Sequence, residues 1–488
     1  MDVPSPTAGA GSTLVAQFGA SAVQVVIVVV LMYVAYRYSL GRVSNRTKRR
    51  LARKGADANT DAAAAAPAAA GDGGGEDAAL PVDPLDLVKS FGIVGEVLVV
   101  NDDAAAGVDS AESDKMMDQL LDILPCRLSG GFTTNARVYD WLDKGASHVV
   151  VEYAASNLGF LDGVPKERIT IAVTVTGSAG EELQIAGGGA GTLHAAMDEI
   201  RYYGTRLLVS FDGAMDRSAV ETAKALTDTV KGLMLNVQDP LSADDVAYLD
   251  AKGIESILDE PLKDGSMTIA SALGAVLVSD RPDGLIPTVV VDEDLVSLGL
   301  CYSNHESLAE AFKLCVGVYW SRTRGLWIKG LTSGATQELL RIDLDCDRDS
   351  MRFVVRQAGA GFCHMGISSC FGEDHGSLGA LMRTLIDRRN NAPAGSYTKR
   401  LFDDEALLKS KLLEECEELM AAKDNREVAF ETADVVYFAF AACARHGVNL
   451  AAVQRSLARK ALRVRRRPGN AKPAGWKPGD PSPDAAVA

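Results

Sequence analysis

The strongest constraint on the fold is a regular alternation of two patterns between residues 81 and 280. Short runs rich in β-branched residues, such as GEVLVV, SHVVVEYA, ITIAVTV and TRLLVSF, alternate with amphipathic stretches such as SAVETAKALTDTV. Nearly continuous apolar strands that are separated by helices are typical of a parallel sheet covered on both faces. We therefore expect a parallel α/β domain over residues 81–280.

The length of the chain predicts further domains. A prior of about 150 residues per domain gives roughly three domains for a chain of 488 residues. The 65 Asp and Glu residues outnumber the 50 Lys and Arg residues, and the net charge of −15 argues against a general nucleic-acid binder. Eight irregularly spaced cysteines are too few for a disulfide framework in such a chain, which favours metal or catalytic use in a reducing compartment.

The first 54 residues predict a membrane or targeting segment. No charged residue occurs between Asp2 and Arg37, and residues 19–36 just reach the length that a bilayer requires. The basic residues that follow predict either a membrane anchor with the catalytic mass facing the cytosol, or a removed segment that directs import into an organelle such as a plastid. Residues 55–80 are rich in Ala and Gly and predict a linker, and residues 474–488 form a tail.

One strand–helix–strand unit of the α/β domain resembles the phosphoribosyl-handling β/α barrels of histidine biosynthesis. The unit is RLSGGFTTNARVYDWLDKGASHVVVEYA, whose glycine pair is equally typical of a tight turn and of a phosphate site at a helix N-terminus. The resemblance implies a barrel-like arrangement of residues 81–280, although about 200 residues is short for eight complete units. Asp102 and Asp212, which each follow a predicted strand, are the candidate acids of this domain.

The stretch DLDCDRD, residues 343–349, places an acid at every second position around Cys346. If the stretch is a strand, its four aspartates point to one face and Cys346 points to the other, because successive side chains alternate. A dense row of carboxylates is typical of a cation site. It is also typical of a solvated edge strand whose charges discourage pairing between sheets, and the stretch alone leaves both interpretations open.

A second cysteine cluster follows in GFCHMGISSCFG. Thiolates from Cys346, Cys363 and Cys370 would fill three corners of a tetrahedral zinc site and leave the fourth for water, as in catalytic zinc sites. Zinc lowers the pKa of such a water towards 7, and His364 offers a free imidazole to move the proton. Buried cysteines that bind no metal are also compatible with this spacing.

Three successive blocks resemble phosphoribosyl-AMP cyclohydrolase over residues 281–372. They are DGLIPTVVVD, YWSRTRGLWIKGLTSGATQELLRIDLDCDRD and GFCHMGISSCFG. The resemblance implies an α+β domain that hydrolyses the N1–C6 bond of the adenine ring of phosphoribosyl-AMP, with zinc on Cys346, Cys363 and Cys370. It also implies a homodimer, because in this family the second subunit supplies two of the three zinc ligands. It further implies that magnesium is held near the substrate phosphate by Asp345, Asp347 and Asp349.

The basic block SRTRGLWIKGLTSG lies within this match. The resemblance implies that it grips the phosphoribosyl group through charge-assisted hydrogen bonds. The candidate residues of this block are Ser321, Arg322, Arg324, Lys329, Ser333 and Gly334. Leu331 stands where the family usually has Glu. Without the resemblance, the block is typical of an exposed basic loop.

After Gly376 the pattern predicts helices. NNAPAGSY interrupts the 3.6-residue period, and EALLKSKLLEECEELMAAK and EVAFETADVVYFAFAACARHG predict two long helices. Glu415 and Glu418 are three positions apart, as are Glu431 and Asp434, so each pair shares a helix face. Carboxylates among aromatic residues are costly to bury without a cation, so we expect a divalent metal here, with ordinary solvated charges as the alternative.

The ExxE and ExxD pairs resemble the all-α, MazG-like pyrophosphohydrolases. GSYTKRLF, KLLEECEEL and FETADVVYF match the phosphoribosyl-ATP pyrophosphohydrolase branch, over residues 376–473. The resemblance implies that magnesium on the four helical acids positions the triphosphate of phosphoribosyl-ATP, and that water cleaves it between the α and β phosphates. Lys399, Arg400 and Arg388 are candidates to neutralise the developing charge.

These two activities are consecutive steps of histidine biosynthesis. Their order, together with the closing LRVRRRPGNAKP, resembles the multifunctional histidine-biosynthesis proteins of the fungal type. Those proteins continue into a histidinol dehydrogenase, an activity that we do not expect from these 488 residues. Two alternatives stay open: a housecleaning pyrophosphohydrolase of ordinary nucleotides, and a membrane-tethered, non-catalytic scaffold with structural zinc. A substrate panel tests the first alternative and metal analysis tests the second.

Overall fold

The computed structural model describes residues 92–465 except for ten short gaps. These gaps are 102–110, 154–157, 178–181, 187–190, 213–214, 231–233, 239–241, 259–261, 263–265 and 373–375. The predicted membrane or targeting segment, linker and tail lie outside the described residues. Among the helices of the described part, no single one is long and apolar enough to cross a bilayer. Two consecutive helices, Asn425–Arg445 and Leu450–Ala461, together have the length and the apolar composition of a membrane span, but they are bent by 106° relative to each other.

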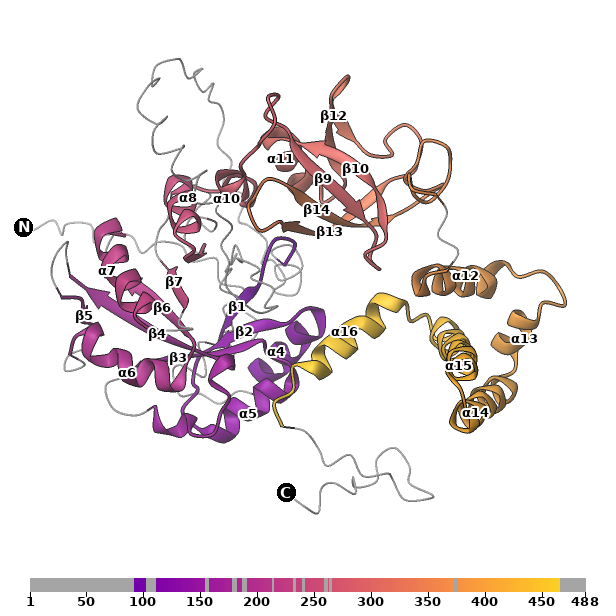
Figure 1. The fold of residues 1–488 in the computed structure, drawn as a ribbon, viewed down its shortest axis with the longest axis horizontal. Helices are drawn as coiled ribbons and strands as arrows, with labels where there is room; N and C mark the ends of the chain where they lie inside the picture. Colours follow the sequence, from indigo (N-terminus) through magenta and orange to yellow (C-terminus); the bar gives the residue numbers. More distant parts are fainter. Residues whose placement is uncertain are drawn as a thin grey trace, which may run out of the picture.

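The first unit contains an eight-stranded sheet, as the alternating pattern predicts (Figure 1). Seven parallel strands are neighbours in chain order: β1 (Val97–Val100), β2 (Cys126–Ser129), β3 (His148–Glu152), β4 (Ile169–Thr176), β6 (Arg206–Phe211), β7 (Met234–Gln238) and β8 (Glu255–Ile257). The short β5 (Gln184–Ile185) pairs antiparallel with β4. The α-helices of this unit are α4 (Ala111–Ile123), α5 (Asn135–Lys144), α6 (Leu193–Tyr203), α7 (Arg217–Asp228), α8 (Ala243–Ala251) and α10 (Ile269–Val276).

The parallel sheet is strongly curved, because side chains from distant strands meet on its inner face. Nη2 of Arg127 on β2 lies 3.1 Å from Oε2 of Glu255 on β8, and Nη1 of Arg206 on β6 lies 2.7 Å from Oε1 of the same residue. In a flat sheet, β2 and β8 would be five strand spacings of about 4.8 Å apart. An apolar cluster also joins alternate strands, as in the interior layers of a barrel. Its members are Leu98, Val150, Leu208 and Ile257.

The second unit contains a four-stranded sheet in the order β10-β9-β14-β13. β14 and β9 are parallel, and the other two pairs are antiparallel. A two-stranded hairpin and the helix α11 (His305–Leu314) complete this α+β unit, which agrees with the expected fold class. Its strands are β9 (Ile286–Val291), β10 (Ser297–Ser303), β11 (Val318–Ser321), β12 (Gly325–Ile328), β13 (Gln337–Leu344) and β14 (Met351–Gln357).

The third unit is helical, as predicted. Each of its helices begins at a residue whose side chain accepts a backbone N–H of the first turn, which satisfies a donor that the helix itself cannot. The predicted interruption separates the first two helices. The helices are α12 (Leu378–Asn391), α13 (Tyr397–Asp403), α14 (Glu405–Ala421), α15 (Asn425–Arg445) and α16 (Leu450–Ala461). Leu385, Leu401 and Phe438 belong to its own small apolar core.

The C-terminal helix α16 connects the helical unit to the first unit (Figure 1). Nε of Arg459 donates to the carbonyl oxygen of Lys144, at the C-terminal end of α5, at 2.5 Å. Nη1 of Arg168 donates to the carbonyl oxygen of Leu462 at 2.5 Å, and Arg465 pairs with Asp143 at 2.6 Å. Guanidinium groups stabilise the carbonyl end of a helix, so these contacts attach α16 to the α/β unit.

Candidate active sites

Residues 345–350 form a turn, so the predicted alternation of a continuous strand across residues 343–349 is wrong. β13 ends at Leu344, and the chain then turns into β14. The carboxylate of Asp345 accepts the backbone N–H of Asp349 at 3.0 Å, the backbone N–H of Ser350 at 3.2 Å and the Ser350 hydroxyl at 2.7 Å. Arg348 adopts a positive φ of 63°. A short acidic side chain that bonds its own backbone favours a turn over a strand.

The turn brings together the three predicted magnesium ligands. One carboxylate oxygen each of Asp345, Asp347 and Asp349 lies within 4.8 Å of the others. Asp343 remains on β13 and pairs instead with Arg341 and Arg352. Burial opposes the charge of Asp345, but the hydrogen bonds of the turn, chiefly from Ser350, lower its pKa. Three adjacent carboxylates fit a hard divalent cation such as magnesium.

Two of the three predicted zinc ligands meet within one chain. Burial and the neighbouring thiol of Cys363 raise the pKa of Cys370, so the two thiols lie close together, in a loop closed by a bond from Cys363 N to Ile367 O at 3.1 Å. Cys346 is exposed in the aspartate turn, where its Sγ lies 4.0 Å from Oδ1 of Asp347. In the part of the chain that the structure describes, no candidate metal group of three ligands contains a cysteine. One chain therefore offers two separate parts of the predicted thiolate site.

Lys329 is a buried neighbour of these thiols, so the interpretation as an exposed loop is wrong for this residue. Its side chain is 5% exposed, and its Nζ donates to Ala335 O at 3.2 Å and lies 5.3 Å from the centre of the Phe362 ring. Burial lowers the pKa of Lys329, and the thiols of Cys301, Cys370 and Cys363 act in the opposite direction. Cys301, which is also buried here, was not predicted as a site residue, because the spacing of the cysteines in the sequence does not distinguish it.

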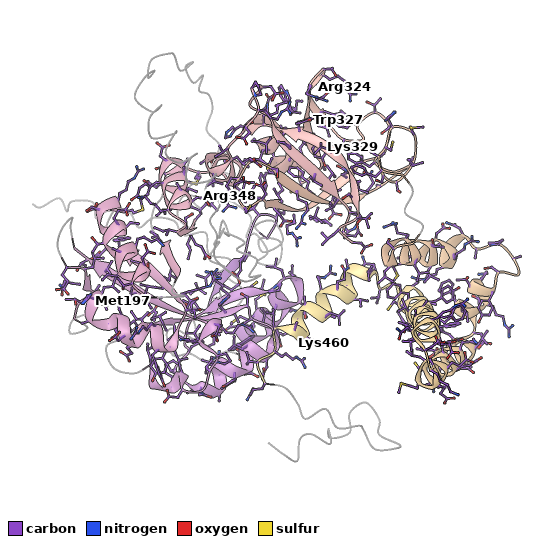
Figure 2. The ribbon with its side chains drawn as sticks, in the orientation of Figure 1. Met197, Arg324, Trp327, Lys329, Arg348 and Lys460 are labelled. Atoms are coloured by element: carbon purple, nitrogen blue, oxygen red, sulfur yellow. The ribbon has the colours of Figure 1, made fainter. Side chains whose placement is uncertain are left out.

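The β11–β12 hairpin presents two exposed guanidinium groups. The guanidinium of Arg322 stacks on Tyr302 at 4.8 Å, and that of Arg324 stacks on Trp327 at 5.1 Å. The hydroxyl of Ser321 accepts the N–H of Arg324 at 3.3 Å across the turn. Ring stacking restricts a guanidinium while leaving its N–H groups free to bind an anion. Figure 2 shows Arg324, Trp327 and Lys329 together on this side of the unit, with Arg348 of the aspartate turn lying toward the α/β unit.

Three other predicted residues occupy nearby loops. Ser333 accepts the N–H of Ala335 at 3.3 Å, and Gly334 has a positive φ of 73°, so both residues shape the turn that leads to β13. His364 is exposed, and its Nδ1 lies 3.9 Å from Sγ of Cys363. An exposed imidazole beside a candidate zinc ligand can exchange protons with solvent and with a bound molecule.

The helical acids form a second candidate metal group. Carboxylate oxygens of Glu415 and Glu418 on α14 and of Glu431 on α15 lie within 4.8 Å of one another. Asp434 does not belong to this group of three, although its charge acts on Glu431. Burial, followed by the charges of Glu418, Asp434 and Glu415, raises the pKa of Glu431. Among the described residues, none forms a hydrogen bond with its buried Oε2, and such an oxygen beside two carboxylates fits a divalent cation.

Lys411 is a further charged neighbour that sequence reasoning missed. Its Nζ lies 2.8 Å from Glu415 and 2.9 Å from Glu414, above the ring of Phe438. The four-residue spacing between Lys411 and Glu415, which places both on one helix face, could have identified Lys411 from the sequence.

The three predicted cations of this unit are exposed on α12 and α13, and one of them, Lys399, lies 3.7 Å from Asp403. These cations are Arg388, Lys399 and Arg400.

The candidate acids of the α/β unit form no comparable group. Asp102 lies outside the described residues, and Asp212 follows β6 with its N–H bonded to Val175 O at 3.0 Å. At Gly130, which has a φ of 107°, an added Cβ would lie 2.2 Å from Asn101 O. This glycine therefore permits the close approach of two loops, which explains it without a phosphate.

Two segments match known protein families. Residues 299–372 match phosphoribosyl-AMP cyclohydrolase, and residues 378–461 match phosphoribosyl-ATP pyrophosphohydrolase. Both candidate metal groups lie inside the corresponding segment, since the aspartate turn falls in the first and the helical acids fall in the second.

The chain is also similar to whole proteins over part of its length. The chain is 48% identical over 254 residues to a histidine biosynthesis trifunctional protein of Komagataella pastoris, covering 52% of this chain and 30% of that one. It is 50% identical over 219 residues to the histidine biosynthesis bifunctional protein his7 of Schizosaccharomyces pombe, covering 45% and 51%. It is 37% identical over 188 residues to the histidine biosynthesis bifunctional protein HisIE of a Nostoc species, covering 36% of this chain and 87% of that one. The chain thus spans about a third to a half of these two fungal relatives and most of the bacterial one.

Proposed function

Because this chain belongs to the family of the histidine biosynthesis bifunctional protein HisIE, we propose that it catalyses two consecutive hydrolyses. The helical unit converts phosphoribosyl-ATP into phosphoribosyl-AMP and pyrophosphate, and the α+β unit then opens the adenine ring of phosphoribosyl-AMP. The observation that carries this proposal is the presence of one metal-ligand group in each matched segment, at Asp345, Asp347 and Asp349 and at Glu415, Glu418 and Glu431.

In the helical unit, we propose that Glu415, Glu418, Glu431 and Asp434 hold magnesium. The metal supplies positive charge to the triphosphate when it is bound. The buried Oε2 of Glu431 lacks a hydrogen bond among the described residues, which supports its use as a ligand. Lys411 holds the carboxylate of Glu415 in place through an ion pair of 2.8 Å. The exposed cations of α12 and α13 are available to neutralise charge on the phosphates.

In the α+β unit, we propose a zinc site shared between two chains. Cys363 and Cys370 of one chain would join Cys346 of the partner subunit, which fits the meeting of only two of these thiols within a chain. Zinc supplies a Lewis acid that lowers the pKa of water when it is bound. His364, exposed beside Cys363, would accept and return the proton at its imidazole.

The phosphoribosyl group then needs cationic partners outside the thiolate site. The stacked guanidinium groups of Arg322 and Arg324 suit bidentate bonds to phosphate, and Ser321 belongs to the same turn. We propose that Asp345, Asp347 and Asp349 would hold magnesium, which would supply positive charge near the same phosphate. Lys329 lies instead beside the thiols: burial and the Cys363 thiol raise the pKa of Cys370, and the positive charge of Lys329 acts in the opposite direction.

A homodimer is also supported by exposed apolar side chains on the helical unit. Leu413 is 56% exposed, Met420 84% and Phe430 67%, all on α14 and α15. Large apolar side chains that are exposed in one chain are often covered at protein interfaces. We propose that a second copy of this chain covers them.

Separation of the two activities tests the proposal. Glu431→Gln should abolish pyrophosphate release from phosphoribosyl-ATP while ring opening of supplied phosphoribosyl-AMP continues. Cys363→Ser should have the opposite effect. Glu414→Gln, beside the helical group but paired with Lys411 and outside the proposed ligands, is the matched control and should retain both activities. If Glu431→Gln releases pyrophosphate at the normal rate, the assignment of the helical unit is wrong.

A further inference from the structure

A cavity of about 350 Å³ lies between the α+β unit and the helical unit; none of the proposed metal ligands lines it, although Ser369 in its wall is next to Cys370. The turn between β9 and β10 and the segment after β14 form one side. α12 and the start of α16 form the other side. Most of its exposed lining is apolar, with contributions from Leu298, Met382, Ile386 and Leu450. Such a mixed cavity between units is a common position for a small-molecule site.

Asp294 places a carboxylate in the wall of this cavity. Its side chain is 9% exposed, and no described residue donates a hydrogen bond to its buried Oδ1. Gly379 on α12 makes room for it, because an added Cβ at that position would lie 2.4 Å from Oδ2 of Asp294. A buried anionic oxygen without a partner is costly, so this side chain calls for a cation or a donor.

The neighbouring acids already have partners. Oδ1 of Asp292 accepts the N–H groups of Asp294 at 3.0 Å and of Val296 at 2.9 Å, and its Oδ2 lies 3.0 Å from Arg383. Glu293 lies 3.4 Å from Arg356. Arg383 reaches Oδ2 of Asp294 only at 3.7 Å. Burial, together with the charges of Asp292 and Glu293, raises the pKa of Asp294. Asp294 is therefore the acid of this wall whose charge is least compensated.

The lining favours an organic cation over a metal ion or a phosphate ester. A metal ion needs several oxygen ligands, and the described residues form such groups only at the aspartate turn and at the helical acids. The charged residues of the lining carry a net negative charge, which would repel a phosphate. They are the acids Asp292, Glu293 and Asp294 and the arginines Arg356 and Arg383. An ammonium, guanidinium or imidazolium group needs one carboxylate, and the apolar walls accommodate the rest of such a molecule.

We propose that this cavity binds a small organic cation, whose charged group pairs with Asp294 and whose apolar body packs between Met382 and Leu450. None of the residues proposed to bind substrate or metal lines this site. Because both units line it, its occupant would also add contacts that hold α12 against the α+β unit.

Ligand-observed NMR titration of the full chain tests this proposal with benzylamine as the probe and benzyl alcohol as its uncharged counterpart. Benzylamine should bind the wild type, and benzyl alcohol should bind it much more weakly. Asp294→Asn should weaken benzylamine binding by about tenfold or more, because the ion pair is lost. Glu293→Gln changes charge in the same wall but leaves Asp294 in place, so it is the matched control and should retain most of the affinity.

A second variant tests the cavity even if Asp294→Asn is misfolded. Ile386→Trp fills the cavity and leaves Asp294 unchanged, and it should also block benzylamine, while its thermal midpoint reports whether the chain is folded. Three outcomes overturn the proposal: no binding to the wild type, equal binding of both probes, or equal binding of benzylamine to the wild type and to Asp294→Asn.

Discussion

The carboxylate of Asp345 accepts the backbone N–H of Asp349 at 3.0 Å, and this bond closes the turn that brings three aspartates together. The same turn holds Cys346 at an exposed position of the α+β unit. Arg348, also in the turn, pairs with Asp250 of α8 at 2.8 Å, which joins the turn to the α/β unit. The proposed magnesium ligands and one proposed zinc ligand are therefore positioned by a single local structure.

Mixed dimers test whether the zinc ligands come from two chains. Chains with Cys346→Ser and chains with Cys363→Ser should each form inactive homodimers in the cyclohydrolase assay. Their heterodimer contains one complete site, made of intact Cys346 from one chain and intact Cys363 and Cys370 from the other. It should recover about half of the wild-type activity per dimer if the sites act independently. An inactive heterodimer, verified as such by two affinity tags, would place all three ligands in one chain.

Magnesium removal tests the helical acids without an activity assay. Calorimetric titration should show that Glu431→Gln loses one magnesium site per chain, whereas Glu414→Gln keeps it. Without magnesium, Glu431→Gln should also have a higher thermal midpoint than the wild type, because Glu418 and Glu415 no longer repel a third carboxylate. Equal magnesium stoichiometry in the wild type and in Glu431→Gln would remove Glu431 from the ligand set.

The inner face of the α/β unit provides a stability prediction. Arg127→Met leaves Glu96 and Glu255 without their shared arginine, and loss of one partner from a buried ionic group costs about 3–5 kcal/mol. Arg217→Met breaks an exposed pair with Asp245 and should cost no more than about 1 kcal/mol. Guanidinium unfolding followed by circular dichroism measures both changes. Equal costs for the two variants would show that the inner network contributes no more than a surface pair.

Asp294 gives a pH prediction with a defined sign. Because its pKa is raised in the folded chain, the wild type binds this proton more tightly when folded, and the resulting stability is lost as the pH rises through the raised pKa. Asp294→Asn should therefore be more stable than the wild type at pH 7, with a difference that shrinks toward pH ~4. Thermal unfolding across this range measures the difference.

Asp283 supplies a control of opposite sign. Its pair with Arg281 lowers its pKa, so its contribution is present at neutral pH and is lost on acidification. Asp283→Asn should thus be less stable than the wild type at pH 7. If Asp294→Asn changes stability in the same direction as Asp283→Asn, the burial of an uncompensated carboxylate at Asp294 is contradicted.

The strands of the α/β unit show what sequence patterns can and cannot reveal. β-branched runs predicted β3, β4 and β6, because these strands bury apolar residues on both faces. β2 and β8 gave no such signal, since their inner residues include Arg127 and Glu255. These charges are buried only because the curved sheet brings them to each other. Sequence periodicity records the faces of one strand and contains no information about a partner 128 residues away.

In the candidate sites, the sequence likewise indicated the types of ligand but not their geometry. The motifs identified the aspartates and the helical glutamates, since metal chemistry restricts the ligand types. The strand interpretation of residues 343–349 failed because side-chain-to-backbone bonds at Asp345 outweigh the alternation of residue types. The cavity at Asp294 had no sequence signal, because the turn after β9 and α12 are distant in the chain. Such a site becomes visible only after the units are packed together.

Turnover of phosphoribosyl-ATP by the purified chain tests the central proposal most directly. The assay follows pyrophosphate release and the ring-opened product together, and compares phosphoribosyl-ATP with ATP and dATP as alternative substrates. We predict that both products appear in succession, and that kcat/KM for phosphoribosyl-ATP exceeds that for the ordinary nucleotides by more than about tenfold, or ~1.4 kcal/mol. Similar kcat/KM values for all three nucleotides, with no ring-opened product, would contradict the proposal and favour a housecleaning pyrophosphohydrolase.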